Sequence, residues 1–136
     1  MPAAQVVLDS HALLALLRDE AGSETVAAIL EKAGQRDQPV HMTEVNYAEV
    51  QYTIRRKDGD AAWATIAGEL RVAPIEFHPA DRRLADAATD FKVRFKISLA
   101  DAFAAALAKE KKAELVTGDP EFKAVEKEVR IRWLDG

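Results

Sequence analysis

The sequence predicts a single α/β domain in which helices cover both faces of a mainly parallel central sheet, an α/β/α arrangement of three layers. Short apolar runs alternate with longer helical patterns along the chain, and parallel neighbouring strands require such helical crossovers. The length of 136 residues, with 49% hydrophobic and 31% charged residues, suits one domain over 1–136 with a sizeable core.

The chain is expected to begin with a strand and two helices. Residues 4–8 form a short apolar run with a Val-Val pair that stops at Asp9, and a leucine-rich helix follows. Over 23–34 the apolar side chains recur at helical spacing. Ser23 is the expected N-cap of this helix, and Gly34 is its expected end.

The next elements are a strand and two further helices. A short strand over 39–42 precedes a helix over 43–57, for which Thr43 is the expected N-cap. Asp58 is expected to cap the following helix, which ends near Leu70.

The second half of the chain contains three predicted strands. The first covers 71–77, where Pro74 favours a position at the edge of the sheet. Pro79 suits the start of a helix, and the most apolar helix of the chain follows over 98–108. The remaining strands are expected over 113–117 and 128–134.

Four acidic residues follow the strands, at the edge of a parallel sheet where ligands bind. Asp9 and Asp119 come directly after strands, and Glu49 and Asp101 lie near the starts of helices. Each also has a purely structural interpretation. Asp9 and Asp119 suit turns or caps, Asp101 completes a capping box begun by Ser98, and Glu49 suits an exposed helix face.

The apolar surroundings of these acids favour a metal site over the structural interpretation. Ser98 and Asp101 are the polar residues of 97–107, so this helix is expected to be covered on most sides. A buried carboxylate without a partner is costly, and no Lys or Arg lies within one helical turn of Asp9 or Asp101. Oxygen ligands in a chain without Cys favour Mg²⁺ or Mn²⁺ as the partner.

These residues resemble the PIN-domain ribonucleases, and among them the VapC-like toxins of bacterial and archaeal toxin–antitoxin pairs. The resemblance spans essentially the whole chain and rests on four segments in order: Val6-Val7-Leu8-Asp9-Ser10, Asn46-Tyr47-Ala48-Glu49-Val50, Ser98-Leu99-Ala100-Asp101-Ala102 and Leu115-Val116-Thr117-Gly118-Asp119-Pro120-Glu121-Phe122. It implies a PIN-like nuclease domain that hydrolyses RNA phosphodiester bonds with Mg²⁺ or Mn²⁺, a metal-dependent endoribonuclease.

The resemblance also implies roles for individual residues. Asp9, Glu49, Asp101 and Asp119 are expected to form the catalytic acidic quartet. Of these, Asp9, Asp101 and Asp119 are the expected metal ligands, and Glu49 either binds the metal or orients water. Ser10 and Thr117 are expected in supporting roles, with Ser10 standing where many relatives have Thr. Glu44 is an alternative to Glu49 that fits the motif less well.

Contacts with RNA are expected to be local, because the net charge of −4 gives no overall positive field. The candidate phosphate contacts are Arg55, Arg56, Lys92, Arg94 and Lys96. The alternative interpretation of each cluster is a solvated helix end. The three histidines, His11, His41 and His78, fall in separate segments, so no histidine metal site is expected.

Two protein partners are expected. The resemblance implies a small cognate antitoxin and a homodimer, and the apolar character all round the 98–108 helix independently favours a homodimer. The chain start has no basic segment before its apolar run, and no apolar stretch approaches membrane-spanning length, so a cytoplasmic protein without membrane contact is expected.

Two alternative functions remain open at this point. One is a non-catalytic PIN-like binding module, which the presence of all four acids disfavours. The other is a Mg²⁺-dependent aspartyl-phosphate phosphatase or receiver domain with Asp9 as the phosphoryl acceptor. That chemistry usually has a Lys beside the phosphoryl group, and no predicted strand ends in Lys.

Overall fold

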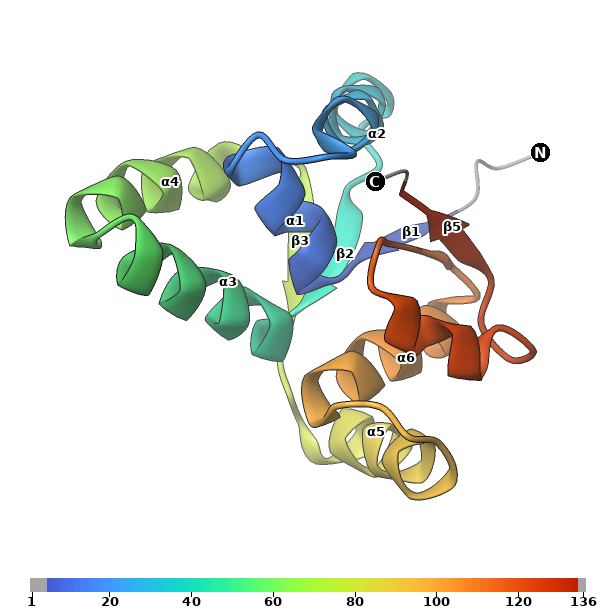
Figure 1. The fold of residues 1–136 in the computed structure, drawn as a ribbon. Helices are drawn as coiled ribbons and strands as arrows, with labels where there is room; N and C mark the ends of the chain where they lie inside the picture. Colours follow the sequence, from blue (N-terminus) through green and yellow to red (C-terminus); the bar gives the residue numbers. More distant parts are fainter. Residues whose placement is uncertain (1–4, 135–136) are drawn as a thin grey trace.

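A five-stranded parallel sheet lies between two layers of helices in the computed structural model, which describes residues 5–134 (Figure 1). The strands are β1 (Val6–Leu8), β2 (Val40–Thr43), β3 (Ile75–His78), β4 (Glu114–Thr117) and β5 (Ile131–Trp133). The helices are α1 (Ser10–Leu17), α2 (Ser23–Arg36), α3 (Glu44–Lys57), α4 (Asp60–Val72), α5 (Arg82–Arg94) and α6 (Leu99–Lys111), with a 3₁₀ helix η1 (Pro120–Val125). The predicted fold class is confirmed.

The strand order is β3-β2-β1-β4-β5, and every neighbouring pair is parallel. The short strand β1 lies at the centre, where Val7 is in register with His41 of β2 and with Leu115 of β4. Because all strands run the same way, the segments that follow β1, β2 and β4 meet at the carboxyl ends of the strands, along one side of the sheet.

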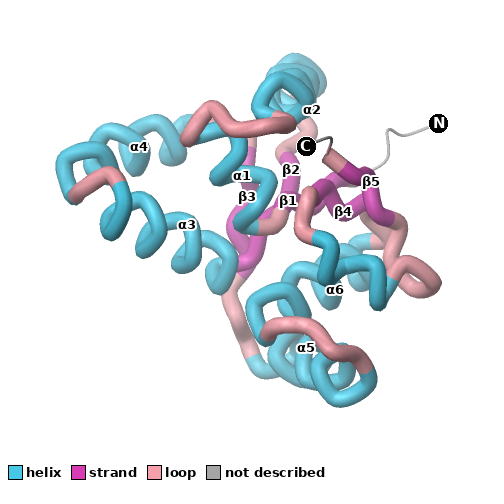
Figure 2. Tube along the Cα trace, in the orientation of Figure 1, coloured by secondary structure: helices cyan, strands magenta, loops and turns pink. Residues whose placement is uncertain are grey.

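The helices cover both faces of the sheet (Figure 2). On one face Val7 and Leu115 pack with α5, α6 and η1, in a cluster that includes Phe91, Leu107 and Phe122. On the other face Leu8, Val40 and Val116 pack with α1 and α2, and Met42 packs with α3 and α4. Both faces of the central strands β1, β2 and β4 are therefore largely buried, whereas the edge strands β3 and β5 are only partly buried.

Helix caps agree with the sequence in two places and differ in two. The side chains of Thr43 and Ser98 accept the hydrogen bonds from Asn46 N and Asp101 N that define N-caps. Ser23 instead lies inside α2, whose N-cap is Gly22, and Asp58 ends α3 rather than starting α4. The Asp58 carboxylate pairs with Arg18, a partner 40 positions away that no local pattern reveals.

Some element boundaries also differ. Arg71 and Val72 continue α4, and β3 begins only after Pro74, at the edge of the sheet as expected. Asp81, not Pro79, caps α5. The α2 helix passes Gly34 and ends at Arg36, and the last strand is shortened because residues 128–130 form the turn that leads into it. Ala4, the predicted start of the first strand, lies outside the described residues.

Within residues 5–134, the structure contains no helix with the length and apolar character needed to cross a membrane.

Two valines in helices provide a test of the core. Val50 in α3 is fully buried, whereas Val72 in α4 is 85% exposed. Val50→Ala is expected to lower the free energy of unfolding by about 1–3 kcal/mol, because it removes buried methyl groups and leaves a cavity. Val72→Ala should change it by less than about 0.5 kcal/mol. Both variants gain the helix propensity of Ala, so urea denaturation of the pair isolates the contribution of burial; equal effects would contradict this packing.

Candidate active site

Asp9 is held at the point where β1 ends and α1 begins. Its backbone is extended, and its buried carboxylate accepts hydrogen bonds from Ala12 N at 2.8 Å and from Thr117 Oγ1 at 2.5 Å. The first contact makes Asp9 the N-cap of α1, and the second ties it to the end of β4. The structural interpretation of Asp9 is thus confirmed, and it leaves the side chain fixed in one orientation.

Asp101 lies in the first turn of α6, where seven consecutive residues after it are buried. Its own residue is 5% exposed, and its Oδ2 atom is buried without a hydrogen-bond partner in the described structure. The backbone N–H of Asp101 donates to Ser98 Oγ at 3.1 Å, so the capping role uses the main chain and leaves the carboxylate free. An unpaired buried carboxylate is costly and calls for a cation or a proton.

Glu49 is oriented by two side chains from different elements. Ser10 Oγ donates to Glu49 Oε1 at 2.8 Å, and Asn46 Nδ2 donates to the same oxygen at 3.4 Å. Asn46 is fully buried, is fixed by Thr43 and also donates to the backbone carbonyl of Ala100 in α6. Glu49 therefore faces the site, whereas Glu44 is exposed in the first turn of α3.

Asp119 and Glu121 form the wall of the site after β4. Thr117 Oγ1 accepts the backbone N–H of Asp119 at 3.0 Å, and Asp119 Oδ1 accepts that of Glu121 at 2.9 Å. Glu121 Oε1 in turn accepts the backbone N–H of Ser98, which fastens η1 to the start of α6. Oxygens of Asp101, Asp119 and Glu121 lie within 4.8 Å of one another, a separation suited to one metal ion.

Burial and nearby carboxylates raise the pKa of both Asp9 and Asp101. Burial is the largest cause that raises the pKa of Asp9 to about 7, and Asp119 and Glu49 raise it further, while Thr117 and Ala12 oppose the shift. Burial likewise raises the pKa of Asp101 to about 8, helped by Asp119, Asp9 and Glu121. Asp9 and Asp101 thus lie near the other two predicted acids, Glu49 and Asp119, and near Glu121. Glu121 is part of the fourth motif segment, but the sequence indicated no role for it.

His11 also reaches this edge of the sheet. Its Nδ1 accepts the backbone N–H of Gly118 at 3.2 Å, and a Cβ at position 118 would overlap the imidazole ring. Glycine at 118 therefore allows His11 to pack over the loop that carries Asp119.

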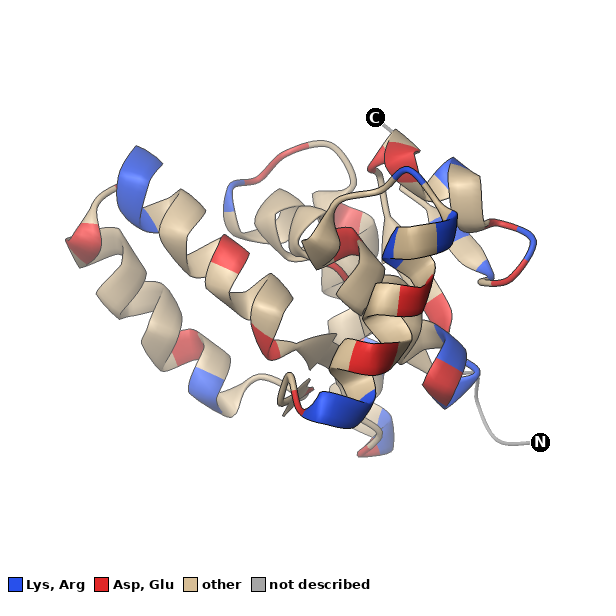
Figure 3. Cartoon of the chain, turned by 90° about the horizontal axis from the view of Figure 1, so that it is seen from below, with Lys and Arg blue, Asp and Glu red and all other residues tan. Residues whose placement is uncertain are grey.

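The basic residues predicted to touch RNA are mostly engaged within the protein. Arg94 pairs with Asp90 and Glu128, Arg55 pairs with Asp60, and Lys92 donates to the backbone carbonyl of Ile97. Arg56 and Lys96 are exposed, with no ion pair among residues 5–134. In the view of Figure 3, Lys and Arg are mixed with Asp and Glu over the helices rather than gathered on one face.

A protein-family model matches most of this chain. The model of the PIN domain family matches residues 6–128, which contain all of the acids described above. The chain belongs to the PIN domain family. No significant match was found among curated protein sequences.

Solved structures share this PIN fold at low sequence identity. VapBC2 from Rickettsia felis, bound to a promoter DNA fragment, superposes with a TM-score of 0.75 at 15% identity over 96% of this chain and 98% of that one. VapC20 from Mycobacterium tuberculosis, a Sarcin-Ricin loop cleaving toxin, gives 0.70 at 19% identity over 89% and 95%. FitAcB from Neisseria gonorrhoeae gives 0.70 at 20% identity over 93% and 96%.

The raised pKa of Asp101 makes a prediction for the metal-free protein. Between its ordinary pKa of 3.8 and about 8, the folded state binds more protons than the unfolded state, so this group lowers stability as pH rises. Asp101→Asn should therefore be more stable than wild type at pH 8 by about 1 kcal/mol or more, with the difference shrinking toward pH 5. Urea denaturation in EDTA measures the difference in the free energy of unfolding between Asp101→Asn and wild type at pH 8 and at pH 5.

Asp86→Asn is the matched control, because Asp86 is exposed on α5. Because its side chain is exposed, this substitution should change the free energy of unfolding at pH 8 by less than about 0.5 kcal/mol. If Asp101→Asn is less stable than wild type at pH 8, then the ionised Asp101 carboxylate does not destabilise the metal-free protein, and the prediction is wrong.

Proposed function

We propose that this PIN domain protein is a Mg²⁺- or Mn²⁺-dependent endoribonuclease and the toxin of a toxin–antitoxin pair. The observation that carries the nuclease proposal is the buried Oδ2 of Asp101, which has no hydrogen-bond partner in the described structure and lies near Asp119, Asp9 and Glu121, whose negative charges add to burial in raising its pKa. A divalent cation removes this electrostatic cost, and the fold places the acids at the ligand-binding edge of a parallel sheet.

The residues present fit a hard divalent ion. Every candidate ligand is a carboxylate oxygen, the donor type that Mg²⁺ and Mn²⁺ prefer. We assign Asp9, Asp101 and Asp119 as ligands, with Glu121 added because its oxygen lies within reach of Asp101 and Asp119. When bound, such an ion lowers the pKa of a coordinated water and stabilises negative charge on a phosphodiester.

Glu49 is positioned to act on water rather than only on the ion. Ser10 and Asn46 both donate to Oε1, so Oε2 is the oxygen available to accept a hydrogen bond from the nucleophilic water. Thr117 supports the opposite side of the site by fixing Asp9 and the backbone of Asp119 with one hydroxyl. Arg56 and Lys96 remain the exposed candidates for RNA phosphate contacts.

The nuclease proposal predicts a metal-dependent activity. Purified protein freed of metal with EDTA should not cleave RNA, and added Mg²⁺ or Mn²⁺ should restore cleavage. Asp9→Asn and Asp101→Asn should each lower the rate by at least about 100-fold, because each removes a ligand charge. The exposed Asp86→Asn is the control and should cleave at the wild-type rate. Undiminished cleavage by Asp101→Asn would rule out this site. If neither wild type nor any variant cleaves RNA with added metal, the result would favour a non-catalytic binding module.

The toxin proposal is supported by the fold and by what its structural neighbours are. The neighbours from Rickettsia felis and Mycobacterium tuberculosis are a VapBC toxin–antitoxin protein and a VapC toxin. An active ribonuclease in the cell that makes it needs control from outside its own fold. A cluster of carboxylates favours a basic inhibitor, such as an Arg that makes charge-assisted hydrogen bonds with Asp9 or Asp101 in place of the ion.

Co-expression with the neighbouring open reading frame tests the toxin proposal separately from the nuclease proposal. The wild-type chain should slow growth when expressed alone, and the neighbouring protein should relieve this effect and co-elute with the chain on gel filtration. Asp101→Asn serves as the non-toxic control. Growth arrest unchanged by the neighbouring protein, with no complex on the column, would reject the antitoxin while leaving the ribonuclease intact.

A homodimer is also proposed, on different grounds from those given by the sequence. Residues 101–108 of α6 are all buried within one chain, so the apolar side chains of this helix need no second chain to cover them. The argument for a homodimer from the apolar character of the 98–108 helix is therefore wrong. The exposed apolar side chains near this region are Val93 at the end of α5, 78% exposed, and Leu99 at the start of α6, 54% exposed. Sedimentation at tens of micromolar should give a dimer of the 15.0 kDa chain, and Leu99→Asp should shift it to the monomer. A monomer in the wild type would contradict this.

A further inference from the structure

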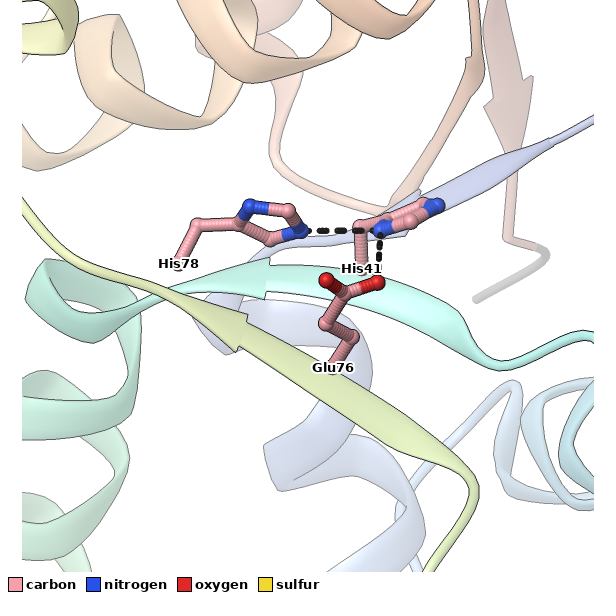
Figure 4. A group of neighbouring side chains, drawn as sticks. All are labelled: His41, Glu76 and His78. Atoms are coloured by element: carbon pink, nitrogen blue, oxygen red, sulfur yellow. Dashed lines mark hydrogen bonds and ion pairs between the residues drawn. The ribbon is translucent and has the colours of Figure 1, made fainter.

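Three metal-ligating side chains lie together on strands β2 and β3, apart from the acidic site. His41 belongs to β2, and Glu76 and His78 belong to β3 (Figure 4). The parallel register pairs His41 with Glu76 and Thr43 with His78, so all three side chains point to the same face of the sheet. The expectation that the histidines are scattered is therefore wrong: pairing of the strands brings His41 and His78 together.

The ligand atoms of the three side chains converge. His41 Nδ1 is 2.9 Å from His78 Nε2 and 3.5 Å from Glu76 Oε2, and all three atoms lie within 4.8 Å of one another. Two imidazoles and one carboxylate are the donor set of many three-ligand Zn²⁺ sites. Mg²⁺ prefers oxygen ligands, so this cluster and the acidic site select different ions.

Gln5 orients His41 in the way that metal-binding histidines require. His41 Nε2 is 2.6 Å from Gln5 Oε1, an acceptor, so Nε2 carries the proton and Nδ1 keeps its lone pair. The other ring nitrogen of a metal-binding histidine commonly donates to an oxygen in this way. In the metal-free protein His78 Nε2–H donates to His41 Nδ1. Metal binding needs only the transfer of that proton to Nδ1 of the same His78 ring.

The charge state of the cluster also suits a cation. Burial is the largest cause that lowers the pKa of both His41 and His78; Lys111 acts in the same direction and Glu76 opposes the shift. Neutral imidazole is the form that binds metals. Glu76 supplies a negative charge that offsets part of the charge of the ion and the repulsion from Lys111.

We propose that His41, Glu76 and His78 bind one Zn²⁺ ion. A cavity of about 500 Å³ lies beside the cluster where the strands begin, and its lining includes Gln5, His41 and Glu76 but not His78. His41 is 6% exposed and Glu76 is exposed, so the cluster has a buried side and an open side from which an ion enters. The bound ion joins edge strand β3 to β2.

Zinc titration in excess Mg²⁺ tests the site, because Mg²⁺ occupies the carboxylates and leaves the histidines. Competition with a chromogenic chelator should detect one equivalent of Zn²⁺ that Mg²⁺ does not displace. Glu76→Gln and His78→Gln should each weaken its affinity at least tenfold, and Gln5→Ala should weaken it about tenfold through lost orientation of His41. Zn²⁺ should also raise the Tm of wild type but not of His78→Gln.

His11→Gln is the matched control, since it removes the remaining histidine of the chain and leaves the cluster intact. Its Zn²⁺ affinity should stay within twofold of wild type. Circular dichroism of the metal-free variants checks that each is folded, and the exposed Glu76 provides a variant that leaves the buried His41 in place. The proposal fails if no Zn²⁺ binds in excess Mg²⁺, or if His78→Gln binds it with less than a tenfold loss.

Discussion

The pairing of β1 with both β2 and β4 is the constraint on which the rest of the structure depends. This strand has three residues, yet it fixes the register of its two neighbours. Thr43 and Thr117 end β2 and β4, and Asp9 and Asn46 follow β1 and β2, so these residues come together at the carboxyl ends of the strands. Hydrogen bonds from these hydroxyl and amide groups hold the acids more firmly than a flexible loop would.

Asp9 and Asp101 both take part in helix caps and both keep carboxylate lone pairs free. At Asp101 the main-chain N–H satisfies the cap and the carboxylate stays free, whereas at Asp9 each carboxylate oxygen accepts one hydrogen bond and keeps a second lone pair. Helix N-termini also favour negative charge, which offsets part of the cost of gathering carboxylates there. The fold therefore tolerates a cluster of like charges that would be more costly elsewhere.

Local patterns predicted the fold class, most of the elements and the four acids, since hydrophobic periodicity and cap residues are visible within one segment. The pattern could not place the start of β3, because Val72 suits a strand as well as the exposed end of α4. Contacts between distant segments were also missed: Arg18 with Asp58, Glu121 with Ser98, and His41 with His78. Each depends on how strands and helices are brought together, a property that no single segment carries.

The two edge strands limit how this protein can associate. β3 has four residues and follows a proline, and β5 has three, so each edge offers few unpaired backbone groups to another chain. Natural sheets use short edges of this kind to prevent the addition of strands from neighbouring molecules. These edges therefore disfavour assembly of this chain by strand addition. A partner of extended conformation would find no long strand to continue at either edge of this sheet.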